Sequence, residues 1–320
     1  MTVQYSGQIS SSLLLAKNVR QQEPLFAPAC IKIVRHEILV VDEIGHKIFR
    51  FDTDLEQRGC FGKQGKGPGE FWYPSSLCCD SEGCIYVADK WNHRIQVFDE
   101  NGVFMRQIGA FGTDHGTFNE PCSVAWKNGT LYVAERTNGR LQAFNEKGHV
   151  VAAFENNAPM PQFYESRSFK TNLHYKRWLV NASRFCSMDS QFEASGFRVG
   201  VMEYPEELMV LPDGNVVVID KVNNIVAVFS PDLKHKQYIH ADNKAGSGNG
   251  GAPGIINCGA VDDQGVLWLG SDQNKAVMQK ETGMSTVLDV RVGAFDVKEQ
   301  EFLVCDFWDG QLFKFGYTIL

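Results

Sequence analysis

The apolar positions of this chain fall in short runs that recur along its whole length, and most runs end in an acidic residue. Six copies are clear: Ile38 to Asp42, Ile85 to Asp89, Leu131 to Glu135, Val216 to Asp220, Leu267 to Ser271 and Phe302 to Asp306. Four or five apolar and β-branched residues in a row predict a strand that is covered on both faces. Repetition of such strands predicts a fold built from similar units.

The spacing of the copies indicates which repeat fold this is. They begin at residues 38, 85, 131, 216, 267 and 302, so four of the five gaps are between 35 and 51 residues. About four short strands fit into a unit of that size, which is typical of a β-propeller with four-stranded antiparallel blades around a central channel. We therefore predict an all-β fold in which residues 1–320 form a single β-propeller domain.

The remaining gap is 85 residues long and predicts a hidden unit. Trp178 to Ala182 lies within it as a weak copy of the apolar run, so we expect residues 155–203 to form a degenerate seventh blade. An insertion on a six-bladed ring is the alternative. The last unit stops at Phe315, too early for a complete blade, so Val3 to Leu15 is expected to supply its outer strand and close the ring.

The strand after each apolar run alternates between polar and apolar residues. Arg94-Ile95-Gln96-Val97-Phe98 is the clearest case, and its period of two predicts a half-buried strand near the rim. Asp89 with Asn92 brackets the turn before it, and Asp and Asn favour such turns because they bond their own backbone. We expect these acidic and Asn residues to be scaffold.

Two motifs resemble a known family. Gly-Pro-Gly-Glu-Phe-x-x-Pro at 67–74, followed by Ile-Tyr-Val-Ala-Asp-x-x-Asn-x-Arg-Ile-Gln-Val-Phe at 85–98, is similar to the NHL-repeat β-propellers. The likeness is specific in the second and third units and faint from 155 to 203. It implies the propeller fold and no single activity, because some members bind RNA with a basic face and NHL-like lyases carry a metal or histidine site over the channel.

Composition narrows the functional classes. The chain is 43% hydrophobic and 22% charged, without an apolar stretch long enough for a membrane helix and without a visible secretory signal. Its net charge of -7 disfavours a general nucleic-acid-binding role. Nine cysteines, mostly inside predicted strands, favour a reducing cytoplasm. Whether this propeller is part of a longer protein is left open.

One rim of the propeller gathers unusual residues. Trp91 and Trp308 occupy the same place in their turns, and ring closure would bring their blades close together. Exposed aromatic patches are a recurrent mark of binding surfaces, although packing onto the next blade is the plainer alternative. The predicted partner-binding residues are Trp91, Trp308, Phe307, Ile44, Lys90, Trp72 and Tyr73. We favour a non-catalytic platform for a protein or peptide partner, with no cofactor.

Two alternatives remain. A lyase-like or hydrolase-like enzyme would place a metal or histidine site over the channel, where the candidate residues are Cys122, Glu206, Glu207 and His115. Adjacent strand residues face opposite ways, so at most one of the two glutamates should reach the channel. No histidine pair has metal-site spacing, and a channel-bound divalent cation is not indicated. RNA binding would use the basic and aromatic segment 167–184.

Overall fold

Each apolar run does form a buried strand, and the strands assemble into separate sheets. The computed structural model describes residues 9–12, 24–155, 205–221, 225–240, 256, 258–271, 276–279, 285–287, 292–298, 301–306 and 310–319. Within them the regular elements are β-strands and one short 3-10 turn, η1 (Lys90–Asn92). The described sheets all have four strands with antiparallel pairing, as predicted for propeller blades, and all paired strands except β1 and β24 are sequence neighbours.

The first three blades are continuous in the chain. Blade 1 is β2 (Pro28–Val34), β3 (Glu37–Asp42), β4 (Lys47–Asp52) and β5 (Gln57–Phe61). Blade 2 is β6 (Pro74–Cys79), β7 (Ile85–Asp89), β8 (Arg94–Phe98) and β9 (Phe104–Ile108). Blade 3 is β10 (Pro121–Lys127), β11 (Thr130–Glu135), β12 (Arg140–Asn145) and β13 (Val150–Glu155).

Two further blades are also continuous, and the sixth is not. Blade 4 is β14 (Pro205–Val210), β15 (Val216–Asp220), β16 (Ile225–Phe229) and β17 (Lys236–His240). Blade 5 is β18 (Cys258–Val261), β19 (Leu267–Ser271), β20 (Ala276–Gln279) and β21 (Ser285–Val287). Blade 6 combines β22 (Ala294–Lys298), β23 (Glu301–Asp306) and β24 (Gln311–Ile319) with β1 (Ile9–Ser12).

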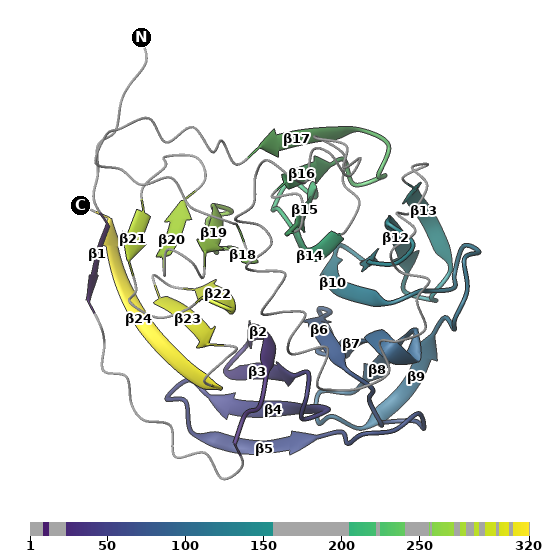
Figure 1. Cartoon of the computed structure of the whole chain (residues 1–320), viewed down its shortest axis with the longest axis horizontal. Coiled ribbons are helices and arrows are strands. Elements are labelled where there is room, and N and C mark those ends of the chain that lie inside the picture. The colour runs from purple at the N-terminus through teal and green to yellow at the C-terminus, as the bar shows by residue number, and fades with distance from the viewer. Residues whose placement is uncertain are drawn as a thin grey trace, which may run out of the picture.

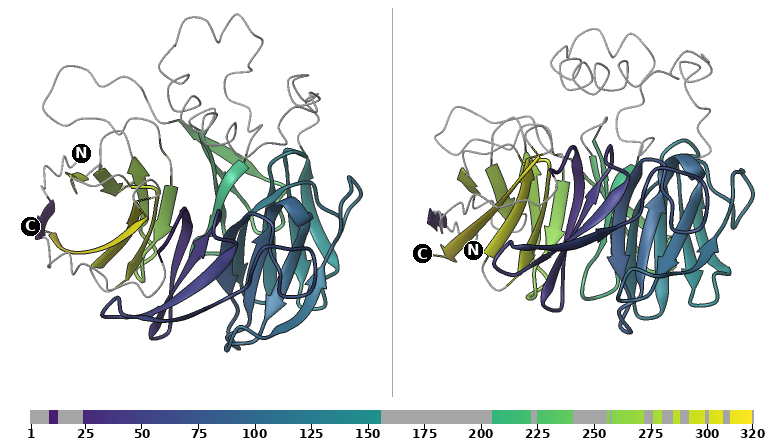
Figure 2. Two further views of the ribbon diagram at one scale, coloured as in Figure 1. Left: turned by 60° about the horizontal axis from the view of Figure 1, so that its bottom comes forward. Right: turned by 90° about the horizontal axis from the view of Figure 1, so that it is seen from below.

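The blades are arranged around a centre, with the first strand of each innermost (Figure 1). Each inner strand contacts the next, from β2 through β6, β10, β14 and β18 to β22, and β22 contacts β2. At the last blade, β1 pairs antiparallel with β24, Ile9 opposite Ile319. The two strands lie side by side at the outside of that blade (Figures 1 and 2).

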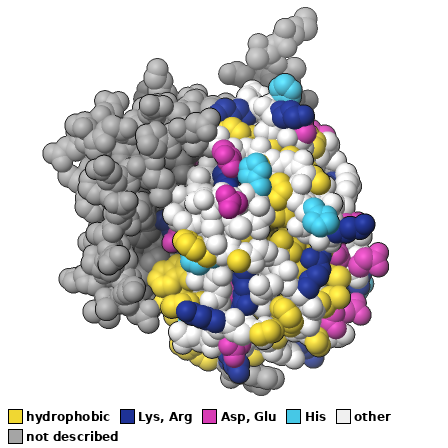
Figure 3. Space-filling model, turned by 90° about the vertical axis from the view of Figure 1, so that its right-hand side faces the viewer, with side chains coloured by type: hydrophobic (Ala, Val, Ile, Leu, Met, Phe, Trp, Pro, Cys, Tyr) yellow, Lys and Arg dark blue, Asp and Glu magenta, His cyan; other side chains and the backbone are white. Residues whose placement is uncertain are grey.

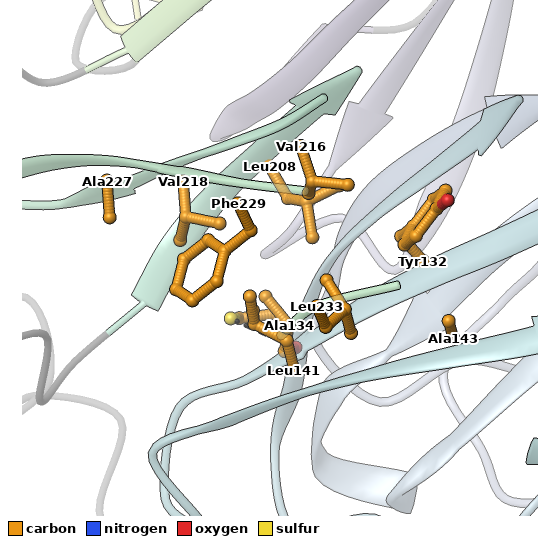
Figure 4. Packing of buried hydrophobic residues seen from close by; sticks show 11 residues of the cluster. Tyr132, Ala134, Leu141, Ala143, Leu208, Val216, Val218, Ala227, Phe229 and Leu233 are labelled. Atoms are coloured by element: carbon orange, nitrogen blue, oxygen red, sulfur yellow. Dashed lines mark hydrogen bonds between the residues drawn. The ribbon is translucent and has the colours of Figure 1, made fainter. Parts of the chain in front are cut away.

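The structure corrects the predicted seventh blade. Blades 3 and 4 pack directly on each other, because Tyr132 and Leu141 of blade 3 share one buried cluster with Val216, Val218 and Phe229 of blade 4 (Figure 4). The Leu208 N–H donates to Ser123 Oγ across this junction at 2.9 Å. No space for a blade is left between them, so the described residues form six four-stranded sheets and not seven. Most of 155–203 and all of 167–184 lie outside the described residues.

The alternating third strands are also more buried than predicted. All five residues of β8 are buried, including its polar ones, because Arg94 and Gln96 hydrogen-bond to the buried Asp89 carboxylate. Burial of polar groups is tolerated when they are paired in this way. The polar face of the strand is therefore an internal clamp and not a solvated surface. Within the described segments, no helix has the length and apolar character needed to cross a bilayer.

Candidate recognition surface

The connectors that enter the first three blades are held by the acid at the end of each second strand. Asp42 accepts the Phe26 N–H at 2.7 Å, Asp89 accepts the Trp72 N–H at 2.7 Å, and Glu135 accepts the Asn119 N–H at 3.0 Å. In the turns, Asn92 donates to Asp89 at 2.9 Å and Asn138 donates to Glu135 at 2.7 Å. The acidic and Asn residues are thus scaffold, and burial raises the pKa of both Asp89 and Glu135.

A second clamp fixes the connectors into blades 2 and 3 through arginine. Arg94 donates to Asp89 at 2.8 Å and to the carbonyl oxygens of Gly67 and Glu70 at 2.8 and 2.9 Å. Arg140 does the same in blade 3. Arg94 is itself buried inside this clamp. The connectors are therefore rigid loops that display their remaining side chains.

Three of the predicted aromatic residues form one cluster. The Trp91 ring lies 4.4 Å from the Tyr73 ring and 6.0 Å from the Trp72 ring, between centroids. The Trp91 N–H donates to the Trp72 carbonyl at 3.0 Å, and Lys66 Nζ lies 4.8 Å above the Trp72 ring. Tyr73 is buried, whereas both tryptophans are half-buried.

The other predicted partner-binding residues differ in burial and in whether the structure describes them. Ile44 is half-buried, and Lys90 is buried with its Nζ paired to the Glu43 carboxylate. Phe307, Trp308 and Asp309 lie outside the described residues. The predicted contact between Trp91 and the last blade therefore stays a prediction.

Two exposed phenylalanines belong to the same rim and were missed by sequence reasoning. Phe26 is 59% exposed and Phe111 is 68% exposed. Phe26 stands two residues before Pro28 just as Trp72 stands two before Pro74, so aligning the connectors would have found it. We call Phe26, Trp72, Trp91 and Phe111 the rim aromatic arc, which spans the connectors into blades 1, 2 and 3.

Two histidines, His46 and His93, contact the connectors that carry this arc. His46 Nδ1 accepts the Tyr73 N–H at 3.0 Å, and its ring meets the Tyr73 ring edge-on at 4.9 Å. One blade further, His93 Nδ1 accepts the Glu120 N–H at 3.1 Å and packs on Phe111 at 4.8 Å. Burial lowers the pKa of both rings, which matches their use as neutral acceptors. Each histidine therefore links its own blade to the connector that enters the next blade.

The outer side of the propeller differs from this rim. Val103, Met105 and Val151 are exposed on or beside the outer strands of blades 2 and 3. Figure 3 shows that hydrophobic side chains on this side are interspersed with charged ones and histidines. Isolated exposed apolar residues are normal on protein surfaces.

Charged side chains occupy the inner part of the rim, which we call the channel mouth. The residue directly after the strand acid is Glu43 in blade 1, Lys90 in blade 2, Arg136 in blade 3 and Lys221 in blade 4. Arg136 Nη2 lies 3.3 Å from Glu206 Oε1, and Lys221 Nζ lies 3.8 Å from Glu206 Oε2. Aligning the repeats would have shown this ring of charges, but not its pairing.

Two of the channel candidates, Glu206 and Glu207, lie in β14, the innermost strand of blade 4. The register shifts between Pro205 and Glu207, so Glu206 sits in a β-bulge and strict alternation fails there. Both Glu206 and Glu207 interact electrostatically with Lys221, and the prediction that at most one of them reaches the channel stays a prediction. Burial would raise the pKa of Glu206, but Arg136 and then Lys221 outweigh it and lower that pKa.

The other two channel candidates are not open to solvent at the channel. Cys122 is buried between blades, where its Sγ donates to the Pro205 carbonyl at 2.8 Å, and burial raises its pKa to about 12. His115 lies away from the channel, with its Nε2 3.0 Å from Glu155 Oε1 on the outermost strand of blade 3. In the part of the chain that the structure describes, no three His, Cys, Asp or Glu side chains form a metal-binding group.

Comparison with known proteins agrees with the repeat motifs. The family model "NHL repeat" matches residues 71–98, which run from the connector Phe71 through η1 to the end of β8. RING finger protein nhl-1 of Caenorhabditis elegans is 37% identical over 68 residues, 21% of this chain and 7% of the relative. NHL repeat-containing protein 3 of Homo sapiens is 37% identical over 68 residues, 20% of each chain. The alignments thus span a fifth or less of these relatives.

Solved structures support the fold over a longer stretch. A streptogramin B lyase structure superposes with a TM-score of 0.58 at 12% identity, covering 100% of this chain and 89% of that one. The WD40 repeats of RRP9 give a TM-score of 0.55 at 10% identity, covering 98% of this chain and 84% of that one. At such identities the likeness concerns the fold alone. Residues 71–98 are therefore an NHL repeat, set in an all-β propeller whose relatives over this region include NHL-repeat proteins.

Proposed function

We propose that this propeller is a non-catalytic recognition platform that binds a protein or peptide through the rim aromatic arc. The observation that carries the proposal is the exposure of Phe26 and Phe111 on either side of the half-buried Trp72 and Trp91. Three aromatic side chains on successive connectors, with Trp91 in the η1 turn beside them, are more than the scattered apolar residues of an ordinary surface. Aromatic residues also dominate the energetic centres of protein interfaces.

The rigidity of the connectors supports the same proposal. The backbone N–H groups of Phe26 and Trp72 are each held by a buried acid, and the Trp91 N–H is held by the Trp72 carbonyl. A surface that is already ordered loses little conformational entropy when a partner binds, so more of its contact energy appears as affinity. This arrangement suits recognition of an extended or folded segment that lies across several blades.

The test uses peptides selected from a phage-displayed random library on the immobilised protein. Binding of each selected peptide is then measured by fluorescence anisotropy to Phe26→Ser and Phe111→Ser and to the matched control Met105→Ser, whose side chain is 55% exposed on the outer strand of blade 2. We expect each rim variant to weaken binding about tenfold or more. The control should leave binding unchanged.

Two results would contradict the proposal: no peptide is enriched, or enriched peptides bind the rim variants and the control equally. The double substitution of Trp91 and Trp308 by Ala gives a second test. Unchanged melting with lost peptide binding supports an interface, whereas intact binding by a well-folded double variant removes the tryptophans from it. A large fall in melting temperature alone assigns them to packing.

The enzyme and RNA alternatives remain predictions. His46 and His93 serve as hydrogen-bond acceptors between blades, and His115 pairs with Glu155, so none of these three contacts favours a catalytic histidine. The basic segment 167–184 lies outside the described residues. Recognition through the rim is the function that the described contacts favour.

A further inference from the structure

Three Asn-Gly pairs lie in turns that the structure describes, and they are held in different ways. They are Asn101-Gly102, Asn128-Gly129 and Asn138-Gly139. An Asn side chain that precedes glycine is open to attack by the glycine backbone nitrogen, because glycine has no Cβ to hinder the approach. Such an attack needs a nitrogen and a side-chain amide that are not already engaged in hydrogen bonds. The surroundings of each pair therefore decide which of them reacts.

Two of the pairs are held by hydrogen bonds. In both turns the glycine N–H donates to a backbone carbonyl, from Gly102 at 3.0 Å and from Gly139 at 3.3 Å. The Asn138 side chain is held as well, because its Nδ2 donates to the Gly112 carbonyl at 3.1 Å and to Glu135 at 2.7 Å. Attack in either turn must first break the hydrogen bond of the attacking nitrogen, and at Asn138 it must also break those of the side chain.

Asn128-Gly129 is the unrestrained pair. It forms the two-residue loop between β10 and β11, with φ of +48° at Asn128 and +78° at Gly129, as in a type I′ turn. Asn128 is exposed. Among the hydrogen bonds of the described residues, none involves the Gly129 N–H or the Asn128 side chain. The attacking nitrogen and the amide that it attacks are therefore both available in this loop.

The same loop sets the pairing of β10 with β11. Lys127 pairs with Thr130 directly across it, and a two-residue hairpin loop fixes the register of the strands that it joins. Beside Lys127, Trp126 stacks on Tyr86 of blade 2 with 5.1 Å between ring centroids. A change of backbone length in the loop would disturb both contacts, because neither strand can shift without moving its side chains.

We propose that Asn128 is a site of spontaneous hydrolytic modification, which converts it to isoaspartate or aspartate and weakens the junction of blades 2 and 3. The Gly129 nitrogen bonds to the side-chain carbonyl carbon of Asn128, the bond from that carbon to Nδ2 breaks, and ammonia leaves with the Gly129 N–H proton. Water then adds to either carbonyl carbon of the cyclic succinimide and breaks its bond to the Gly129 nitrogen, which regains a proton. The net reaction consumes one water and releases one ammonia.

The two products affect the loop differently. Opening at the side-chain carbon gives aspartate and leaves the backbone unchanged. Opening at the main-chain carbon gives isoaspartate, whose side-chain carbon becomes part of the backbone and lengthens the two-residue loop. The isoaspartyl form is therefore the one that should disturb the pairing of Lys127 with Thr130.

The test incubates the folded protein at neutral pH and physiological temperature and quantifies aspartyl and isoaspartyl peptides at the three sites by chromatography and mass spectrometry. We expect Asn128 to react about five- to tenfold faster than Asn101, as for the absence of one hydrogen bond, and faster still than Asn138. In guanidinium chloride the three sites should react at similar rates, because those hydrogen bonds are then lost. Equal rates at Asn128 and Asn101 in the folded protein would overturn the proposal, and so would a preference for Asn128 that persists after unfolding.

A second measurement tests the effect on the blade junction. The isoaspartyl fraction, separated by ion exchange, should melt about 2 °C or more below the fresh protein. Freshly prepared Asn128→Asp carries the new charge without the longer backbone and should melt above that fraction. Asn128→Gln should keep its own melting temperature through the same incubation. An isoaspartyl fraction that melts with the fresh protein would show that the modification leaves the junction intact, which contradicts the proposed weakening.

Discussion

The buried arginine of each clamp allows a quantitative test of how the connectors are held. Arg140 is 3% exposed and donates to the fully buried Glu135 at 2.5 Å. It also donates to the carbonyl oxygens of Asp114 and Thr117 at 3.1 and 2.9 Å, and to that of Thr113. Replacing it with Met keeps much of the volume but leaves the Glu135 carboxylate without its cation.

The expected cost follows from what remains around that carboxylate. Breaking a buried ion pair by removing one partner costs about 3–5 kcal/mol. Glu135 keeps hydrogen bonds from Asn119, Asn138 and Gln142, so we expect Arg140→Met to fall near the lower end, at about 3 kcal/mol. With a urea dependence of about 3 kcal/mol per M, the unfolding midpoint would shift by about 1 M.

The assay is urea unfolding followed by tryptophan fluorescence, with Arg58→Met as the matched control. Arg58 is 63% exposed and also pairs with an acid, Asp52, so its loss should cost under about 1 kcal/mol. Adding Glu135→Gln to Arg140→Met should restore part of the stability, because no buried charge then lacks a partner. If Arg140→Met costs no more than the control, the clamp is not what holds the connector.

Three further predictions concern stability. Because the pKa values of His46 and His93 are lowered in the folded protein, the unfolded chain binds protons first as pH falls. The free energy of unfolding should therefore be highest above about pH 6.5 and decline below it. Replacing both histidines with Asn should flatten that decline in urea unfolding measured over a series of pH values. Deleting residues 1–12 removes β1 from β24 and should lower the melting temperature in calorimetry; an unchanged value would show that this pairing contributes nothing. Gly109→Ala should destabilise by more than about 1 kcal/mol, because φ is +73° and the new Cβ would lie 2.4 Å from a buried phenylalanine ring, whereas Gly59→Ala meets nothing within 4 Å and should be tolerated in the same assay.

The repeat pattern determined much of this protein before its tertiary structure was considered. The apolar runs placed the second strands, such as Ile85–Asp89, and the motifs at 67–98 predicted the NHL repeat. These features are encoded locally, because each strand must be apolar on both faces and each turn needs its own Asp and Asn. Trp72 on the connector into blade 2 and Trp91 in the η1 turn of that blade could be proposed as a surface for the same reason.

Contacts between blades are what the sequence alone left undecided. The spacing of 85 residues suggested a seventh blade, and only the buried cluster that Leu141 shares with Val218 shows that blades 3 and 4 are neighbours. The burial of Arg94, the bulge at Glu206 and the sharing of Glu206 by Arg136 and Lys221 likewise depend on where residues far apart in sequence meet. A local pattern predicts which way a strand's side chains alternate, but whether a polar side chain meets water or a buried partner is decided only when the sheets pack.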